Sequence, residues 1–205
     1  MSNTLLYTIW ESPAGPLILG ATDRGLARLM LPREQLDAAM AELKAEWDGT
    51  LVEDGEPHQY HIDQLHEYFN GRRQAFDVQL DLQGTPFQMQ VWQALSKVPF
   101  GQTRSYGWIA DAIDNPKAVR AVGGANHANP VPLIIPCHRI IGADGSLTGF
   151  GGGLPLKKAL LEWEQEVIIH EMPTLFDPPP LDCYWRKRRR RLVGPGGGPD
   201  APGPC

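Results

Sequence analysis

Residues 134–141 read Ile134-Ile135-Pro136-Cys137-His138-Arg139-Ile140-Ile141, a cysteine followed by a histidine and an arginine between isoleucines. The apolar flanks indicate a buried segment, and a thiol beside an imidazole indicates a nucleophile. Cysteine attacks as its thiolate, so from a reference pKa of about 8.5 it needs a base or a positive neighbour. The residues around this segment therefore decide which chemistry it supports.

His138 is the nearest base in the sequence. If the segment is a strand, neighbouring side chains point to opposite faces, and His138 reaches the sulfur only through a bend or a bridging water. A carboxylate would orient the imidazole, and the following helix offers Glu162, Glu164 and Glu166. The alternative is a core histidine with satisfied hydrogen bonds. The residues alone leave both interpretations open.

Length and composition predict a globular protein. With 205 residues and 42% apolar side chains, the chain can form one ordinary domain or two small ones. No apolar run approaches the roughly 20 residues that span a bilayer, and the first twelve residues alternate like a strand rather than a signal peptide. The three cysteines have no disulfide or zinc spacing. We expect a cytoplasmic protein with Cys137 as a free thiol, no metal and no cofactor.

The first 84 residues predict a small α+β unit. Three short strand-like runs, separated by turn signals, predict an antiparallel sheet at residues 5–12, 16–22 and 26–31. Apolar residues then recur at helical spacing over 36–47 and 62–69. An alternating run over 76–82 predicts a further half-buried strand.

Residues 85–171 predict a mainly α-helical unit. Thr85-Pro86-Phe87-Gln88 has the pattern of a capping box that starts a helix. Ser105 can cap a short helix over 106–113, and Asn115-Pro116 can start another that runs to about residue 126. Two short helices joined by a tight turn are a candidate helix-turn-helix, although most such pairs only pack together.

The second of these helices has an unusual surface. Arg120 lies among small residues, with Ala118 before it and Gly123-Gly124 after it. The chain has a net charge of −5, but residues 101–158 carry 6 basic and 3 acidic side chains and are the part best suited to a polyanion. A small-residue helix can press into a nucleic-acid groove while Arg120 projects, or it can pack tightly against a neighbouring helix.

Two flanking segments complete the central region. Asn129, eight residues before the cysteine, can bond the cysteine segment or only its own turn. The glycine-rich loop at 148–153 lacks the Gly-Lys-Ser/Thr ending of a phosphate-binding loop, so a pocket wall is the better interpretation. Residues 172–205, rich in proline and glycine with a basic cluster at 186–191, predict a disordered tail. The cluster can attract DNA or be a solvated charge run.

These motifs together resemble O6-alkylguanine-DNA alkyltransferases, which repair DNA by direct reversal. The resemblance rests on Tyr106, residues 120–125, Asn129-Pro130, residues 136–139 and the glycine-rich loop before Glu164. It is specific from about residue 85 to 166, and the first 84 residues match the family's small ribonuclease-H-like domain in layout. The tail has no counterpart.

The resemblance implies a role for each matching residue. Cys137 would accept the alkyl group from guanine O6 once and irreversibly, and thymine O4 is a further possible donor. His138 would take the thiol proton through a water, with Glu164 orienting it and Asn129 holding the helix-turn-helix against the cysteine segment. Tyr106 would donate a proton to the departing guanine.

The same resemblance implies how DNA would bind. A monomer would bind double-stranded DNA through the minor groove, with Ala118 against the groove and Arg120 filling the gap left by a flipped base. Residues of the base pocket would be the Ile140 carbonyl, Phe150 and the Gly151 N–H, with Lys157 near the entrance.

Some positions depart from family members, and other functions compete. Some members have a tyrosine at the position of Phe150, and some have a bulkier residue at the position of Gly151. The glycine predicts a roomier pocket that accepts larger adducts. The N-terminal half has no cysteine, so the zinc site of some relatives is not supported. A noncatalytic protein that recognises alkylated DNA lacks the acceptor cysteine, which is present here. A cysteine hydrolase would turn over and would not need a helix-turn-helix.

Overall fold

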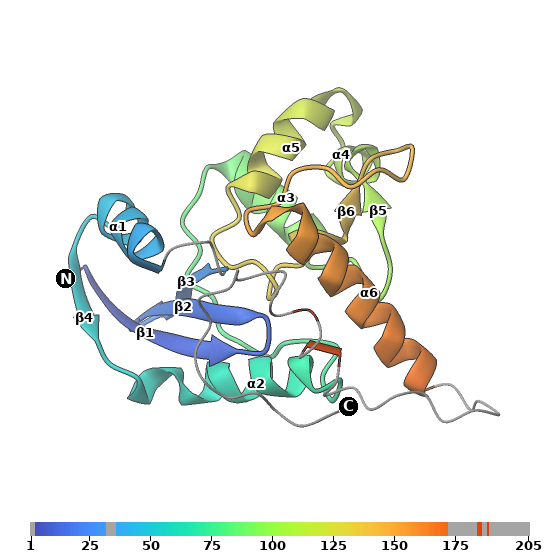
Figure 1. The fold of residues 1–205 in the computed structure, drawn as a ribbon. Coiled ribbons are helices and arrows are strands. Elements are labelled where there is room, and N and C mark those ends of the chain that lie inside the picture. The colour runs from blue at the N-terminus through green and yellow to red at the C-terminus, as the bar shows by residue number, and fades with distance from the viewer. Residues whose placement is uncertain (1–2, 32–35, 172–183, 186–187, 189–205) are drawn as a thin grey trace.

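The computed structural model describes residues 3–31, 36–171, 184–185 and 188. Its first part is a sheet in the order β3-β2-β1-β4 (Figure 1). Strands β1 (Thr4–Ser12), β2 (Gly15–Thr22) and β3 (Gly25–Met30) pair antiparallel, as predicted. Gly15 and Gly25 start β2 and β3 with φ of 120° and 139°, which explains glycine in both turns.

The sheet contains a fourth strand that the sequence did not predict, and the prediction of a strand over 76–82 is wrong. Strand β4 (Thr50–Glu53) pairs parallel with β1 at the sheet edge, so the three antiparallel strands belong to a four-stranded mixed sheet. This strand is short and mostly exposed, so its sequence carries no alternating signal. The run 76–82 alternates between half-buried and exposed residues up to Leu80, but it joins the sheet only by a single bridge between Leu26 and Leu80.

Two helices cover the two faces of this sheet. Helix α1 (Leu36–Glu46) packs on one face with Leu5 and Ile18, which form a small cluster with Leu43. The other face meets α2 (Gln59–Phe69), which follows a 3-10 turn, η1 (Glu56–His58). Its apolar side chains join a larger cluster that also contains the second half of the chain.

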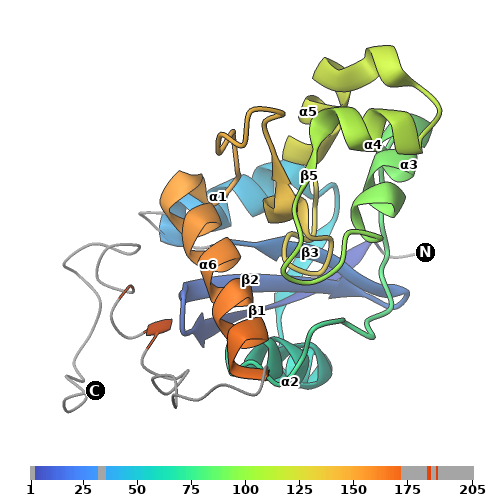
Figure 2. The same cartoon turned by 90° about the vertical axis from the view of Figure 1, so that its right-hand side faces the viewer.

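The second part of the chain is mainly helical, as predicted. Thr85 and Gln88 form the expected capping box at the start of α3 (Pro86–Leu95). Ser105 caps α4 (Tyr106–Ala112), and a 3-10 turn, η2 (Pro116–Ala118), leads into α5 (Val119–His127). Helices α4 and α5 form one end of the molecule, and α6 (Gly153–Glu171) runs from this end toward α2 (Figure 2).

A short parallel pair lies between α4 and the cysteine. Strand β5 (Arg104–Ser105) pairs with β6 (Ile140–Ile141). Because β5 directly precedes α4 and β6 directly follows the Cys-His-Arg segment, this pair fixes the start of the helix pair beside the cysteine.

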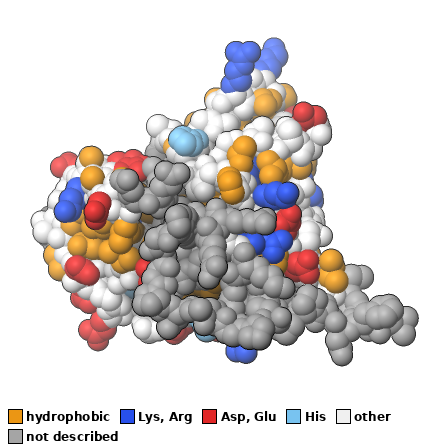
Figure 3. All heavy atoms as spheres, viewed as in Figure 1, with side chains coloured by type: hydrophobic (Ala, Val, Ile, Leu, Met, Phe, Trp, Pro, Cys, Tyr) orange, Lys and Arg blue, Asp and Glu red, His pale blue; other side chains and the backbone are white. Residues whose placement is uncertain are grey.

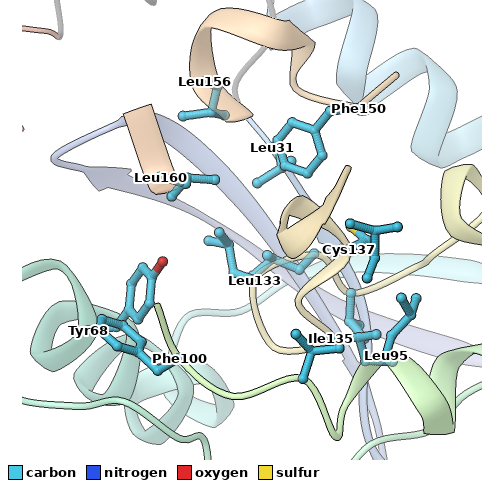
Figure 4. Packing of buried hydrophobic residues seen from close by; sticks show 14 of the residues in the cluster. Leu31, Tyr68, Leu95, Phe100, Leu133, Ile135, Cys137, Phe150, Leu156 and Leu160 are labelled. Atoms are coloured by element: carbon cyan, nitrogen blue, oxygen red, sulfur yellow. The ribbon is translucent and has the colours of Figure 1, made fainter. Parts of the chain in front are cut away.

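The core is continuous between the two parts. Its larger cluster includes Leu17 of β2, Tyr68 of α2, Leu133 and Ile135 before the cysteine, and Leu160 of α6. In Figure 4, Leu133 lies between the Tyr68 ring on one side and Cys137 on the other, with Leu160 above Tyr68. The cysteine segment is therefore a part of the main core.

Part of the predicted disordered tail packs on this core. Tyr184 and Trp185 are 8% and 2% exposed, and the Trp185 ring lies 5.2 Å from Phe69 and 5.7 Å from Trp163, between ring centroids. The expectation of disorder is wrong for these two residues, because two adjacent aromatic rings bury enough apolar surface to hold them. The remaining tail residues, including all of the basic cluster except Arg188, lie outside the described residues.

Within the described ranges, no helix is long and apolar enough to cross a membrane.

Candidate active site

Cys137 lies at the start of a 3-10 turn, η3 (Cys137–Arg139), not in a strand. The expectation that Cys137 and His138 point to opposite faces of a strand is therefore wrong. The prolines before the cysteine and the positive φ of Leu133 (75°) turn the chain within the core, where an extended strand would pass through. The turn buries Cys137, His138 and Arg139 together.

His138 is fully buried and bonds a carboxylate. Its Nε2 lies 2.8 Å from Oε1 of Glu164, which is also fully buried. An ionised carboxylate only accepts hydrogen bonds, so Nε2 carries the proton and Nδ1 is left with a free lone pair. Nδ1 is buried without a hydrogen-bond partner among the described residues. This is the tautomer that a proton acceptor needs.

Glu164 accepts hydrogen bonds at both oxygens. Arg139 donates from Nη2 to Oε1 at 2.9 Å and from Nε to Oε2 at 3.0 Å, and its Nη1 donates to the Val98 carbonyl. The Gly101 N–H donates to Oε2 at 2.8 Å. Burial raises the pKa of Glu164, but His138 and Arg139 outweigh it and hold the pKa at about 2. The carboxylate is therefore ionised at neutral pH.

The electrostatics of the site keep His138 neutral. Burial lowers the pKa of His138, with the charges of Arg139 and Lys157 acting in the same direction, and Glu164 offsets only part of this. Burial also raises the pKa of the Cys137 thiol to about 11, although Asn129 and the charge of Lys157 favour the thiolate. The resting site thus holds a neutral thiol and a neutral imidazole.

Asn129 satisfies both interpretations that the sequence left open. Its Oδ1 accepts from the Val131 N–H of its own turn at 3.1 Å. Its Nδ2 donates to the Ile135 carbonyl at 2.8 Å, and its side chain acts to lower the pKa of the Cys137 thiol. Asn129 follows α5 directly, so it links the end of the helix pair to the cysteine segment.

Lys157 differs from its expected position at the pocket entrance. It is fully buried, and its Nζ donates to the Ile140 carbonyl and to the Thr148 carbonyl. Burial lowers its pKa to about 8. The ammonium therefore ties the glycine-rich loop to the cysteine segment, and its charge acts on the thiol.

Among the other predicted pocket residues, Phe150 packs against His138 and Tyr106 bonds the glycine-rich loop. Tyr106 accepts a hydrogen bond from the Thr148 hydroxyl at 3.0 Å, and Phe150 is buried with its ring edge-on to His138 at 6.4 Å between centroids. Gly151 is exposed, and a side chain added there would meet nothing within 4 Å. Gly151 and Asn129 also line a pocket of about 370 Å³ beside β3 and α1.

Arg120 and Ala118 lie apart from this centre, on the helix pair. Arg120 is exposed, Ala118 is half-buried, and Gly123 and Gly124 have open space where a side chain would project. Lys and Arg side chains project at this end of the molecule in Figure 3, whereas acidic side chains gather over α1 and the sheet edge. Among the described residues, no group of three or more His, Cys, Asp or Glu side chains could hold a metal ion.

Comparison with known proteins identifies the family. Residues 5–82 match the ribonuclease-like domain of 6-O-methylguanine DNA methyltransferase, and residues 86–166 match its DNA-binding domain. A Mycobacterium tuberculosis relative named methylated-DNA–protein-cysteine methyltransferase is 46% identical over 83% of this chain and 98% of its own length. A Methanosarcina acetivorans relative of the same name is 44% identical over 78% and 98%. The chain belongs to the 6-O-methylguanine DNA methyltransferase family.

Solved structures of this family share the fold. Mycobacterium tuberculosis OGT in complex with DNA is 40% identical, with a TM-score of 0.68 over 87% of this chain and 98% of that chain. O6-methylguanine-DNA methyltransferase from Pyrococcus kodakaraensis is 25% identical, with a TM-score of 0.56 over 78% and 98%.

Sequence reasoning missed three members of the methyltransferase site. Arg139 is part of the cysteine motif, but the motif alone indicates no function for it. Its burial would have implied a carboxylate partner. The Gly101 N–H carries no signal in the sequence. Tyr68 donates to Oε1 of Glu164 at 3.0 Å from α2, and its helical spacing indicates only a core position.

Proposed function

We propose that this protein repairs O6-alkylguanine in DNA by transferring the alkyl group to Cys137. The observation that carries the proposal is the buried Cys137 beside a His138–Glu164 pair, within a range that matches the family's DNA-binding domain. The matched ranges also support a division near residue 84 into an α+β unit and an alkyl-acceptor unit.

The reaction follows from the protonation states. As the thiol proton moves to Nδ1 of His138, directly or through a water, the sulfur attacks the alkyl carbon in line with its bond to guanine O6. The S–C bond forms, the C–O6 bond breaks, and guanine leaves with a proton from Tyr106. Glu164 stabilises the imidazolium that forms. The thioether has no route back to the thiol, so each molecule reacts once.

DNA binding is proposed on the helix pair. Open space around Gly123 and Gly124 supports close approach of α5 to a groove, and we assign this groove as the minor one. Arg120 would enter the duplex where the damaged base has flipped out, which offsets part of the few kcal/mol that flipping costs. Phe150, the Gly151 N–H and the Ile140 backbone would receive the base. We expect a monomer in the cytoplasm, associated with the nucleoid if the source is a bacterium.

Intact-mass measurement after incubation with a duplex containing O6-methylguanine tests the proposal. We expect a gain of one methyl group per molecule and none for Cys137→Ala. Binding of this duplex without a mass change would favour a noncatalytic damage-recognition protein. Multiple turnover on an ester or peptide would favour a hydrolase.

A further inference from the structure

Tyr68 reaches the reacting centre from the ribonuclease-like part of the chain. It is fully buried on α2, and its hydroxyl donates to Oε1 of Glu164, the same oxygen that binds His138. Rings of Phe69, Phe76 and Phe100 lie 5.3, 5.5 and 6.0 Å from its ring, between centroids. These contacts hold the Tyr68 ring in place, and Figure 4 shows it beside Phe100.

The hydrogen bonds that Oε1 of Glu164 accepts affect the charge that this oxygen presents to His138. Tyr68 and Arg139 both donate to Oε1, and each draws negative charge away from the hydrogen bond to His138. A carboxylate with less charge at this oxygen stabilises an imidazolium less. The bond from Tyr68 therefore weakens the hold of Glu164 on a proton at His138.

We propose that Tyr68 is a positioning residue for alkyl transfer, whose hydroxyl fixes the Glu164 carboxylate and keeps His138 unprotonated and ready to accept the thiol proton. This inference rests on the proposed function, because it assigns His138 the role of proton acceptor. It gives the ribonuclease-like part of the chain a direct part in the chemistry.

The surrounding charges are consistent with this role. His138 faces Glu164 and Lys157 of α6 and Arg139 of its own turn. Tyr68 faces Glu164, Arg139 and Tyr184, and burial together with the Glu164 charge raises the pKa of Tyr68 well above its ordinary value. The hydroxyl thus stays a donor across the pH range in which His138 titrates.

The test is the pH dependence of single-turnover transfer, followed by intact mass on full-length protein with an O6-methylguanine duplex. For Tyr68→Phe we expect the acidic limb of the rate profile to move to higher pH by about one unit, because His138 becomes more basic. The variant would then be about tenfold slower well below this midpoint and nearly equal to the wild type on the plateau. The Cys137→Ala variant gives the mass of protein that has received no methyl group.

Tyr184→Phe is the matched control. Tyr184 is also buried, and its hydroxyl donates to the Ala159 carbonyl rather than to Glu164. We expect its profile to keep the midpoint of the wild type, even if the protein is less stable. Site-specific 3-fluorotyrosine at position 68 keeps the ring and strengthens the donor, so it should move the limb to lower pH. This substitution tests the role of the Tyr68 hydroxyl even if Tyr68→Phe does not fold.

The outcomes separate the two proposals. No methyl gain by the wild type contradicts the proposed function itself. If the wild type reacts but neither change at position 68 moves the midpoint, Tyr68 is only a packing residue and the inference is overturned. A Tyr184→Phe midpoint that shifts as far as that of Tyr68→Phe overturns it as well.

Discussion

Glu164 holds a full negative charge without exposure to solvent, and its partners make this possible. Removing a carboxylate and a guanidinium from water costs several kcal/mol per ion, which their attraction offsets only with good geometry and complete hydrogen bonding. Arg139, His138, Tyr68 and the Gly101 N–H provide this bonding at the two oxygens. The network therefore fixes the position of the imidazole beside the thiol.

Glu164→Gln should be strongly destabilising, because Arg139 keeps its charge and stays buried without an ionised partner. We expect the free energy of unfolding to fall by about 3 kcal/mol at pH 7. Urea unfolding measures this loss. Glu162→Gln is the control, since Glu162 is 41% exposed, pairs with Lys158 and Arg188, and should lose less than about 1 kcal/mol. Equal losses in the two variants would contradict the prediction.

The same carboxylate predicts an acid limit of stability. The pKa of Glu164 is lowered in the folded protein to about 2 from 4.5. Its contribution is therefore complete above pH 4.5 and is lost as the pH falls toward 2. Urea unfolding at pH 5 and pH 3 should show a smaller difference between wild type and Glu164→Gln at the lower pH.

At the scale of elements, the proposed function assigns DNA binding to the helix pair and base binding to the glycine-rich loop. Helix α5 presents Arg120 to solvent, whereas the loop places the Phe150 ring edge-on to His138. Because Lys157 ties this loop to Ile140, changes in the helix pair and in the loop should affect different steps.

If Arg120 fills the gap left by the flipped base, as proposed, Arg120→Ala should slow transfer from duplex DNA by about tenfold or more. Transfer from the free base O6-benzylguanine should not change, since no duplex is opened. Single-turnover rates on both substrates measure this. Lys44→Ala, an exposed cation on α1, is the control and should leave both rates unchanged. An equal loss on the free base would mean that Arg120 acts in the chemical step.

Gly151→Leu should narrow the base pocket without disturbing the fold. A Cβ atom added at Gly151 or at Gly149 meets nothing within 4 Å, and both residues are exposed. Competition between O6-benzylguanine and methylated DNA should show the benzyl rate falling about tenfold more than the methyl rate in Gly151→Leu. Gly149→Leu should not change this ratio. If the wild type fails to react with O6-benzylguanine, the roomy pocket itself is refuted.

At the scale of the whole molecule, one continuous core joins the ribonuclease-like part, the cysteine segment and α6. Trp185 contributes to this junction by lying between Phe69 of α2 and Trp163 of α6. Arg188 adds an ion pair to Glu162 and lies 3.8 Å over the Tyr184 ring. These described tail residues therefore reinforce the contact between the two parts of the chain.

Trp185→Ala should lower the free energy of unfolding by about 3 kcal/mol, the usual cost of removing a buried tryptophan. Alkyl transfer at 25 °C should persist, because none of the residues around Cys137 is changed. Thermal unfolding and the intact-mass assay measure the two effects. Trp108→Ala removes a tryptophan that is 39% exposed and should cost less. Loss of alkyl transfer in a folded Trp185→Ala protein would contradict the prediction that Trp185 contributes to stability and not to the reaction.

Local patterns in the sequence determined most of the elements. The capping box at Thr85, the Ser105 cap and the glycine turns of the sheet are short-range signals, and each appears where predicted. The four residues of β4 were not predicted as a strand, because their parallel pairing at the sheet edge depends on β1, more than forty residues away along the chain. The burial of Tyr184 and Trp185 was not predicted, because it depends on aromatic rings of α2 and α6.

The sequence by itself singled out the proposed acceptor, since Cys137 lies in a motif whose order of side chains is local information. Spacing alone offered three carboxylates, and the family resemblance singled out Glu164 among them. Tertiary structure gives the physical reason, by burying Glu164 against His138 and Arg139 and leaving Glu162 at the surface. Only the fold brought Tyr68 to the same oxygen. Hydrogen bonds between residues 96 positions apart follow from packing, which no local pattern encodes.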